Sequence, residues 1–224
     1  MRRIGGFCFV VVSLVATPAV VNAQRCLGTA SFADGHLRAQ VGRSSVQGWR
    51  STRVGLSLGH ERGAFVSGGA SRGTYDNSDV TVNGLSASVG YQVPVGTRVQ
   101  VCPTLSVGRS TFTYYTSRSH VDYWGTATGI STSVGVTAWS SSRFDFVPSA
   151  ELAYSRSSER MQSATRGMEN EAQGTYGSGG LSITAGLIFG KVISVSPFVA
   201  LPVGVRGANN VSGISVAISF GNRK

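Results

Sequence analysis

After residue 36 the chain consists of about ten segments in which apolar and polar residues alternate, and the links between them are alternately short and long. Alternation with a period of two indicates β-strands with one apolar and one polar face. Strands of about 9–11 residues, joined by tight turns at one end and long loops at the other, are typical of a barrel that crosses a membrane. The sequence therefore predicts an all-β fold: a single antiparallel up-and-down transmembrane β-barrel of about ten strands, with short periplasmic turns and long extracellular loops.

The predicted strands cover residues 37–45, 51–60, 64–71, 80–92, 98–113, 126–140, 144–157, 179–189, 193–206 and 212–220. The predicted tight turns are 61–63, 93–97, 141–143 and 190–192, and the longest predicted loops are 72–79, 114–125 and 158–178. The alternative is a barrel of eight strands, in which the first hairpin is not part of the wall.

Two of these strands interrupt the alternation. The apolar face changes sides after Val82, which predicts a β-bulge at Asn83 and Gly84. Arg109 breaks the apolar face of the strand predicted at 98–113. Either a second bulge turns Arg109 toward the lumen, or its side chain reaches the lipid headgroups.

The first 23 residues have the three parts of a secretory signal peptide. Arg2 and Arg3 give a charged start, residues 7–15 form an apolar core, and Val21-Asn22-Ala23 is a small-residue cleavage site. The chain is therefore expected to be exported. We expect a signal peptide over residues 1–23, a periplasmic N-terminal arm over 24–36, and the barrel domain over 37–224.

The chain is strongly basic, with 20 Lys and Arg residues against 10 Asp and Glu. Nucleic-acid binding is not expected, because the basic residues are not clustered on a helix and the chain is predicted to be exported. Nearly all of them are arginines, and a guanidinium forms bidentate bonds with phosphate, so contact with anionic lipid headgroups is one interpretation. Ordinary solvated loop charge is the other.

Two cysteines remain after the predicted signal. Cys26 lies in the arm, and Cys102 has the parity of the polar face near the start of its strand. An even number of cysteines in an oxidising compartment favours a disulfide, which would pin the arm into the mouth of the barrel. The alternative is two unrelated small residues.

Four charged residues are predicted to point into the lumen: Arg38, Arg53, Asp145 and Glu151. Buried charges are costly unless they are paired or wet. One hypothesis is a network of ion pairs that stiffens and closes the barrel. The other is a narrow wet pore lined mostly by Ser and Gly.

Aromatic residues gather at both ends of the predicted strands, as in the two girdles that flank a membrane. A soluble β-sandwich or lipocalin-like binder, the third architecture considered, would not sort its aromatics in this way. The predicted girdle at the tight-turn end is Tyr91, Trp139, Phe144, Phe189 and Phe220, and at the long-loop end it is Trp49, Tyr114, Tyr123, Trp124 and Tyr154.

The sequence contains little catalytic or metal-binding chemistry. Among the three histidines, only His120 lies in an extracellular loop beside a serine and a carboxylate, Ser119 and Asp122. A catalytic base also needs an orienting partner and a nucleophile within hydrogen-bond reach, and adjacent residues do not guarantee that geometry. No cluster of His, Cys and Asp has metal-ligand spacing. We expect no cofactor, no metal and no enzymatic activity.

With its cleavable start, its alternating segments and its final segment, the chain resembles the small outer-membrane β-barrel proteins of Gram-negative bacteria, such as the OmpA-, OmpX- and OmpW-like barrels. In the final segment Ile214, Val216, Ile218 and Phe220 alternate with small residues. The resemblance implies that this segment is the signal read by the outer-membrane assembly machinery. It also implies outer-membrane lipid and lipopolysaccharide as partners, and it leaves the oligomeric state open.

The resemblance specifies architecture more than activity, because one barrel design hosts many functions. We expect an integral outer-membrane protein with a structural or surface-interaction role, and a narrow pore for small solutes is left open. The alternative is an enzyme at the barrel rim that acts on lipid A or phospholipid.

Overall fold

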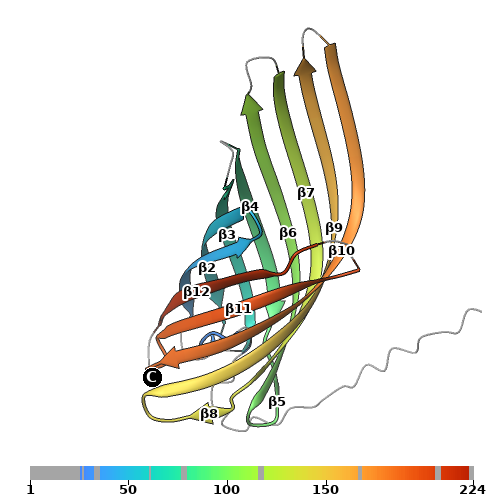
Figure 1. Cartoon of the computed structure of the whole chain (residues 1–224). Helices are drawn as coiled ribbons and strands as arrows, with labels where there is room; N and C mark the ends of the chain where they lie inside the picture. The colour runs from blue at the N-terminus through green and yellow to red at the C-terminus, as the bar shows by residue number, and fades with distance from the viewer. Residues whose placement is uncertain are drawn as a thin grey trace, which may run out of the picture.

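In the computed structural model the chain forms a closed β-barrel (Figure 1). The structure describes Cys26 and residues 28–32, 36–60, 62–76, 80–115, 119–165, 168–204 and 208–221, so the predicted signal lies outside the described residues. The strands are β1 (Leu37–Val46), β2 (Trp49–Gly59), β3 (Ala64–Tyr75), β4 (Thr81–Tyr91), β5 (Val93–Val95), β6 (Val99–Tyr115), β7 (Ser119–Val136), β8 (Trp139–Ser140), β9 (Phe144–Thr165), β10 (Met168–Phe189), β11 (Ile193–Val203) and β12 (Val211–Phe220).

Ten of these strands form the wall, in the order β10-β11-β12-β1-β2-β3-β4-β6-β7-β9, and β9 pairs in turn with β10. The ring is closed along the sequence by the pairing of the first strand, β1, with the last, β12. All pairs are antiparallel. The two short strands, β5 and β8, extend the sheet at the tight-turn end. The prediction of an antiparallel ten-stranded barrel is confirmed, and the eight-stranded alternative is wrong because β1 and β2 belong to the wall.

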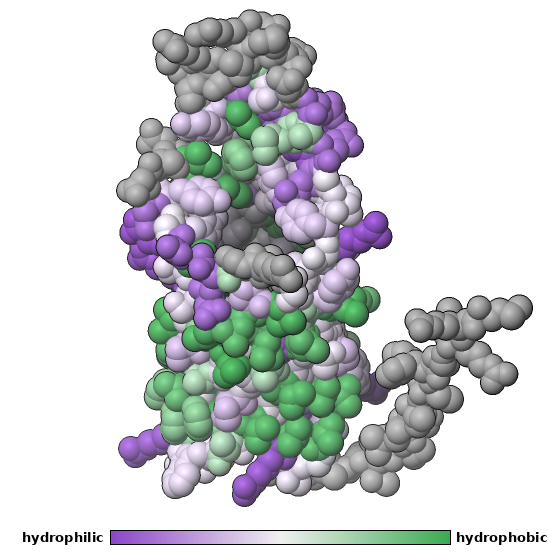
Figure 2. All heavy atoms as spheres, turned by 45° about the vertical axis from the view of Figure 1, so that its right-hand side comes forward, coloured by the Kyte–Doolittle hydropathy of each residue, from purple (hydrophilic) through white to green (hydrophobic). Residues whose placement is uncertain are grey.

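The apolar side chains lie on the outside of the barrel. Leu56, Leu105, Ile130 and Leu152 are 58–63% exposed, although leucine and isoleucine are normally buried in a water-soluble protein. On the face that Figure 2 draws, hydrophobic side chains gather in a band over the lower part of the molecule. Such a band is expected where strands contact acyl chains. No helix in the described part of the chain is long and apolar enough to cross a membrane.

Four strands extend beyond the others, and two of them, β9 and β10, are much longer than predicted. β6, β7, β9 and β10 have 17, 18, 22 and 22 residues and rise far above the other strands (Figure 1). Most of the predicted loops 114–125 and 158–178 are therefore paired strands, which corrects that prediction. Above the membrane both faces of a strand are wet, so the apolar alternation ends although the backbone pairing continues. We call residues 110–115, 119–125, 157–165 and 168–178 the projecting sheet.

The predicted bulge at Asn83 and Gly84 is absent. One register holds from Thr74↔Thr81 to Ala64↔Tyr91, so β3 and β4 pair without an inserted residue. Arg109 also stays in register, opposite Leu85 and Thr126, and so remains on the outer face. The prediction that a bulge turns Arg109 inward is therefore wrong.

An extra residue occurs instead between β7 and β8. Gly135 pairs with Ser149 and Trp139 with Phe146, so four steps along one strand match three along the other. This irregularity reverses the parity after β7 and leaves Trp139 on the outer face, where it is 66% exposed.

A charge introduced on the lipid-facing side is expected to destabilise the barrel much more than the same charge in the lumen. Leu105→Arg places a guanidinium near the middle of the apolar band and should lower the free energy of unfolding by about 2–4 kcal/mol. Ser106→Arg, on the next residue but facing the lumen, is the matched control and should cost far less. Urea unfolding in lipid vesicles would measure both, and equal losses would contradict the assignment of the two faces.

Candidate functional site

The lumen is filled at its tight-turn end by a short piece of the N-terminal arm. Cys26 and residues 28–32, which we call the plug, lie inside the wall, and all of them are buried. Ala30 packs against Val147 and Ile188, which point inward from β9 and β10, and all three are fully buried. The plug therefore gives this end of the barrel a small apolar core inside a largely polar lumen.

A disulfide joins the plug to the wall. Cys26 is bonded to Cys102 of β6, which is 76 residues later in the sequence. The predicted disulfide is confirmed. It ties the arm into the mouth of the barrel, as the parity of Cys102 suggested.

Polar contacts hold the plug on both sides. The Gln92 Oε1 atom accepts hydrogen bonds from the Phe32 backbone N–H at 3.2 Å and from the Ser31 hydroxyl at 3.4 Å. On the far wall, the Ser196 hydroxyl donates to the Gly28 carbonyl at 2.8 Å. These bonds satisfy backbone groups that would otherwise be buried without a partner, which would be costly.

Arg38 is the charged group that the plug covers. Its guanidinium donates a hydrogen bond to the Ala30 carbonyl and lies 4.3 Å above the centroid of the Phe32 ring. The Phe32 ring also stacks on Phe65 of β3, with a distance of 5.3 Å between centroids. A cation over an aromatic face is attracted by the ring quadrupole, so Arg38 helps to seat the plug.

Two glycines in the wall make room for the plug. A Cβ atom on Gly186 would lie 2.4 Å from the Gly28 Cα, and one on Gly59 would lie 2.1 Å from the Phe32 ring. Neither position can carry a side chain without moving the plug, so the wall and the plug are shaped for each other.

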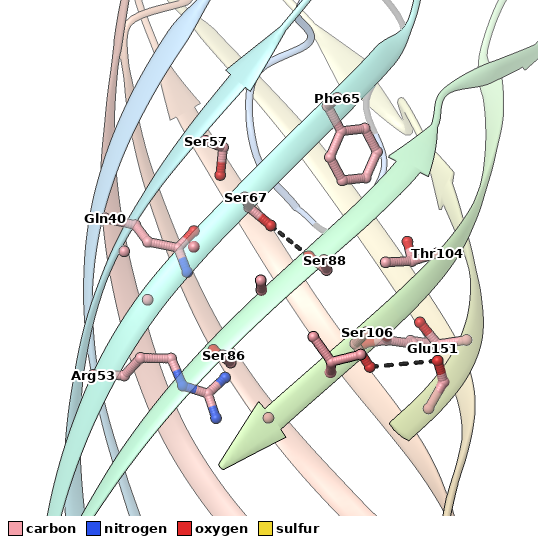
Figure 3. A pocket seen from close by; sticks show the side chains of 18 of the residues that line it. Gln40, Arg53, Ser57, Phe65, Ser67, Ser86, Ser88, Thr104, Ser106 and Glu151 are labelled. Atoms are coloured by element: carbon pink, nitrogen blue, oxygen red, sulfur yellow. Dashed lines mark hydrogen bonds between the residues drawn. The ribbon is translucent and has the colours of Figure 1, made fainter. Parts of the chain in front are cut away.

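Above the plug the lumen contains a cavity of about 420 Å³. Serine, glycine and threonine line most of it, and Arg53 and Glu151 project into it from β2 and β9 (Figure 3). Cys26 and Phe32 of the plug form part of its lining. Figure 2 shows a hollow in the surface above the apolar band. The cavity is therefore a polar space whose tight-turn end is occupied by protein.

The four predicted lumen charges all have inward parity, but they are placed differently. Arg38, Arg53 and Glu151 all line the cavity, but the plug covers Arg38 and leaves it only 5% exposed. Asp145 is buried near the tight turns, where it accepts a hydrogen bond from the Ser140 hydroxyl. In the described part of the chain, Arg38, Arg53 and Glu151 form no ion pair with one another. The ion-pair network is one of the two hypotheses for the lumen; the structure shows no such network among these three residues, and the plug occupies the tight-turn end.

The aromatic residues divide between the two faces. The five at the tight-turn end, Tyr91, Trp139, Phe144, Phe189 and Phe220, lie on the outer face. At the long-loop end only Trp124 and Tyr154 do so, whereas Trp49, Tyr114 and Tyr123 have lumen-side parity. Trp49, for example, packs on Tyr75, 4.6 Å between ring centroids. The predicted outer girdle at this end is therefore wrong for those three residues, because it considered their height and not their face.

The inner face of the projecting sheet carries a hydrogen-bonded cluster that sequence reasoning missed. The hydroxyls of Tyr123 and Tyr176 both donate to Oε1 of Glu159. Tyr123 also stacks on Phe112, with 4.8 Å between ring centroids and 12° between planes. Burial and then the bond to Glu159 raise the pKa of Tyr123, and the bond to Glu159, followed by burial, raises the pKa of Tyr176. Both residues lie above the apolar band.

The candidate histidine lies on the outer face of the projecting sheet. His120 Nε2 is 3.2 Å from Asp122 Oδ1, and the same oxygen accepts a hydrogen bond from the Thr113 hydroxyl at 2.8 Å. In a nucleophilic triad the imidazole stands between the carboxylate and the hydroxyl. Here the carboxylate stands between the other two groups, so this arrangement does not activate the hydroxyl.

The plug could have been anticipated from apolar residues on the wrong face. Phe65, Val147 and Ile188 have inward parity, although apolar side chains are not expected in a polar, water-filled lumen. All three lie near the tight-turn ends of their strands. Apolar residues gathered on the lumen side at one end of the barrel indicate that something apolar packs there.

Replacing Cys26 and Cys102 together with serine is expected to destabilise the protein. The disulfide closes a long loop, and in the chain-entropy model its loss lowers the free energy of unfolding by about 4 kcal/mol. Denaturant unfolding in micelles would measure the difference. A thiol reductant should reproduce the loss in the unaltered protein and have no effect on the double variant; an unaltered protein that ignores the reductant would contradict the prediction.

Two of the seven tyrosines are expected to stay protonated above pH 10, the usual phenol pKa. Deprotonating Tyr123 or Tyr176 would place a phenolate against the Glu159 carboxylate. Because the folded pKa is raised, the stabilisation is fully present below pH 10 and is lost as the pH rises through the folded value. Absorbance at 295 nm would follow the titration. Glu159→Gln should bring the pKa of Tyr176 back toward the usual phenol value more completely than the pKa of Tyr123, because burial is the main cause of the rise at Tyr123. An unchanged titration would contradict the assignment.

Comparisons with known proteins bear on the fold. No protein-family model and no curated sequence matches the chain. The translocator domain of the autotransporter NalP from Neisseria meningitidis is similar, with a TM-score of 0.52 and 15% identity over 84% of this chain and 89% of that one. For the outer membrane protease OmpT from Escherichia coli the TM-score is 0.48 and the identity 6%, over 83% of this chain and 94% of that one. For the N-terminal barrel domain of Pseudomonas aeruginosa OprF the TM-score is 0.41 and the identity 7%, over 82% of this chain and 96% of that one. The chain thus has the fold of the outer-membrane β-barrels, as its sequence suggested.

Proposed function

We propose that this protein is an integral outer-membrane barrel that is closed on the periplasmic side by its own arm and acts as a structural and surface-interaction protein. The observation that carries the proposal is the plug, which is covalently tied to the wall and fully buried inside it. The tight-turn end is taken as the periplasmic end, as in bacterial single-chain barrels.

The plug argues against a conducting role. A channel needs a continuous path of water, and the Ser- and Gly-lined cavity supplies only the part above the plug. Below it, the path meets the Phe32 ring and the packed side chains of Val147 and Ile188. The lumen is therefore better described as a cup open to the outside than as a pore.

The projecting sheet supports the surface-interaction role. It extends two hairpins well beyond the apolar band, and its outer face carries charged residues such as Arg160 and Glu171, which pair at 2.9 Å. Rigid paired strands present side chains in a fixed arrangement, whereas unpaired loops of the same length would not. A partner at the cell surface would meet this sheet first.

The last strand supports a role for the assembly machinery. Ile214, Val216, Ile218 and Phe220 lie on the outer face of β12, and β12 closes the wall by pairing with β1. This strand is the last in the sequence and its apolar face points outward. It is therefore suited to be recognised by the assembly machinery during insertion.

Conductance in planar bilayers tests the plug. The intact protein is expected to give no discrete channels even at high protein load. A variant that lacks residues 24–32 and carries Cys102→Ser is expected to give small channels, because the lumen is then open at both ends. The shift in gel mobility between boiled and unboiled samples verifies that each barrel is folded. Discrete channels from the disulfide-bonded protein would favour the narrow-pore alternative and overturn the proposal.

A further inference from the structure

Four strands that run away from the tight turns share a pattern on their outer face. In each, the first outward residue after the apolar run is an arginine: Val41 is followed by Arg43, Ala70 by Arg72, Val107 by Arg109, and Tyr154 by Arg156. We call Arg43, Arg72, Arg109 and Arg156 the arginine row. All four are exposed.

The arginine row is regularly spaced around the barrel. Its members lie on β1, β3, β6 and β9, which are alternate strands of the wall. Arg43 pairs with Thr52, which in turn pairs with Arg72, so these two arginines flank one threonine in the same row across the sheet. Neighbouring strands are 4.7–4.9 Å apart, so the two Cα atoms are separated by about 10 Å. Two arginine side chains can converge on one group across that distance.

The row differs from the arginines higher on the barrel. Arg50 is bonded to Asp76 at 2.6 Å, and Arg160 to Glu171 at 2.9 Å. Within the described ranges, no member of the row has a carboxylate partner. Arg50 and Arg160 are thus neutralised within the protein, whereas the four members of the row have no carboxylate partner in the described part of the chain.

The height of the row identifies the partner. Each member follows the apolar run on the outer face of its strand, so the row stands at the upper edge of the apolar band. On the face that Figure 2 draws, hydrophilic residues lie above the hydrophobic ones. A guanidinium held at that level faces the headgroups of the outer leaflet and bonds phosphate through two parallel N–H groups. We propose that the arginine row binds the phosphate groups of lipid A, with Arg43 and Arg72 sharing one phosphate above Thr52.

The binding is one-sided. The described outward residues of β10, β11 and β12 include no Lys or Arg. The row spans the arc from β1 to β9, so phosphorylated lipid is ordered on that arc and not around the whole circumference. This inference is independent of whether the lumen conducts.

Native mass spectrometry of the detergent-purified protein with added lipid tests the proposal. Bis-phosphorylated lipid A is expected to bind on the order of tenfold or more tightly than dephosphorylated lipid A, because only the former carries the anionic groups. Replacing all four members of the row with glutamine should abolish this preference. Inorganic phosphate at the same concentration should not displace the lipid, which is also held by its acyl chains.

The control is Arg50→Gln with Arg160→Gln, which removes two arginines of the same sheet that already have carboxylate partners. It should keep the full preference. If the four-residue variant does not fold by gel mobility, Arg43→Gln with Arg72→Gln tests the shared phosphate alone and should lose part of the preference. The proposal is overturned if the unaltered protein does not discriminate, if the variants of the row keep the preference, if the control loses it equally, or if inorganic phosphate competes.

Discussion

The structure depends on one requirement: backbone N–H and C=O groups in lipid must be satisfied within the protein. A sheet meets that requirement only when it closes on itself, because an open edge would leave a row of unpaired groups. Here the first strand, β1, pairs with the last, β12, through an unbroken ladder from Leu37↔Phe220 to Ser45↔Ser212. Closure in turn determines the rest of the sequence, since each strand must present apolar residues outward and can fill its interior with small polar ones.

An interior of this kind cannot hold itself together through hydrophobic packing. The plug addresses that problem at one end. It combines a covalent bond, a hydrogen bond that Gln92 accepts, another that Ser196 donates, and a small apolar contact around Ala30. Gly59 and Gly186 have no side chains, and this leaves the space inside the wall that Phe32 and Gly28 of the plug occupy. Polar ties predominate because most of the lining that surrounds the plug is itself polar.

Much of the barrel could be read from the sequence because the period-two signal is strong wherever one face meets lipid. Leu152 and Ile130 illustrate this, and so does the inward parity of Cys102, which led to the disulfide. The signal fails where both faces are wet, and for that reason the upper halves of β9 and β10 were mistaken for loops. It also fails to give the face of a residue near a strand end. Trp49 has the height of a girdle residue but the parity of the lumen, and the plug's contacts with Phe65 depend on an arm whose sequence has no period at all.

The unequal strand lengths have a consequence for access. β9 has 22 residues and β12 has 10, so at about 3.3 Å per residue the wall is some 40 Å longer, measured along the strand, on one side of the ring than on the other. The rim is therefore slanted. A molecule arriving from outside passes over the low side formed by β12 and β1 and meets the concave tyrosine-bearing surface of the high side, so a ring that is closed within the membrane has a front and a back above it.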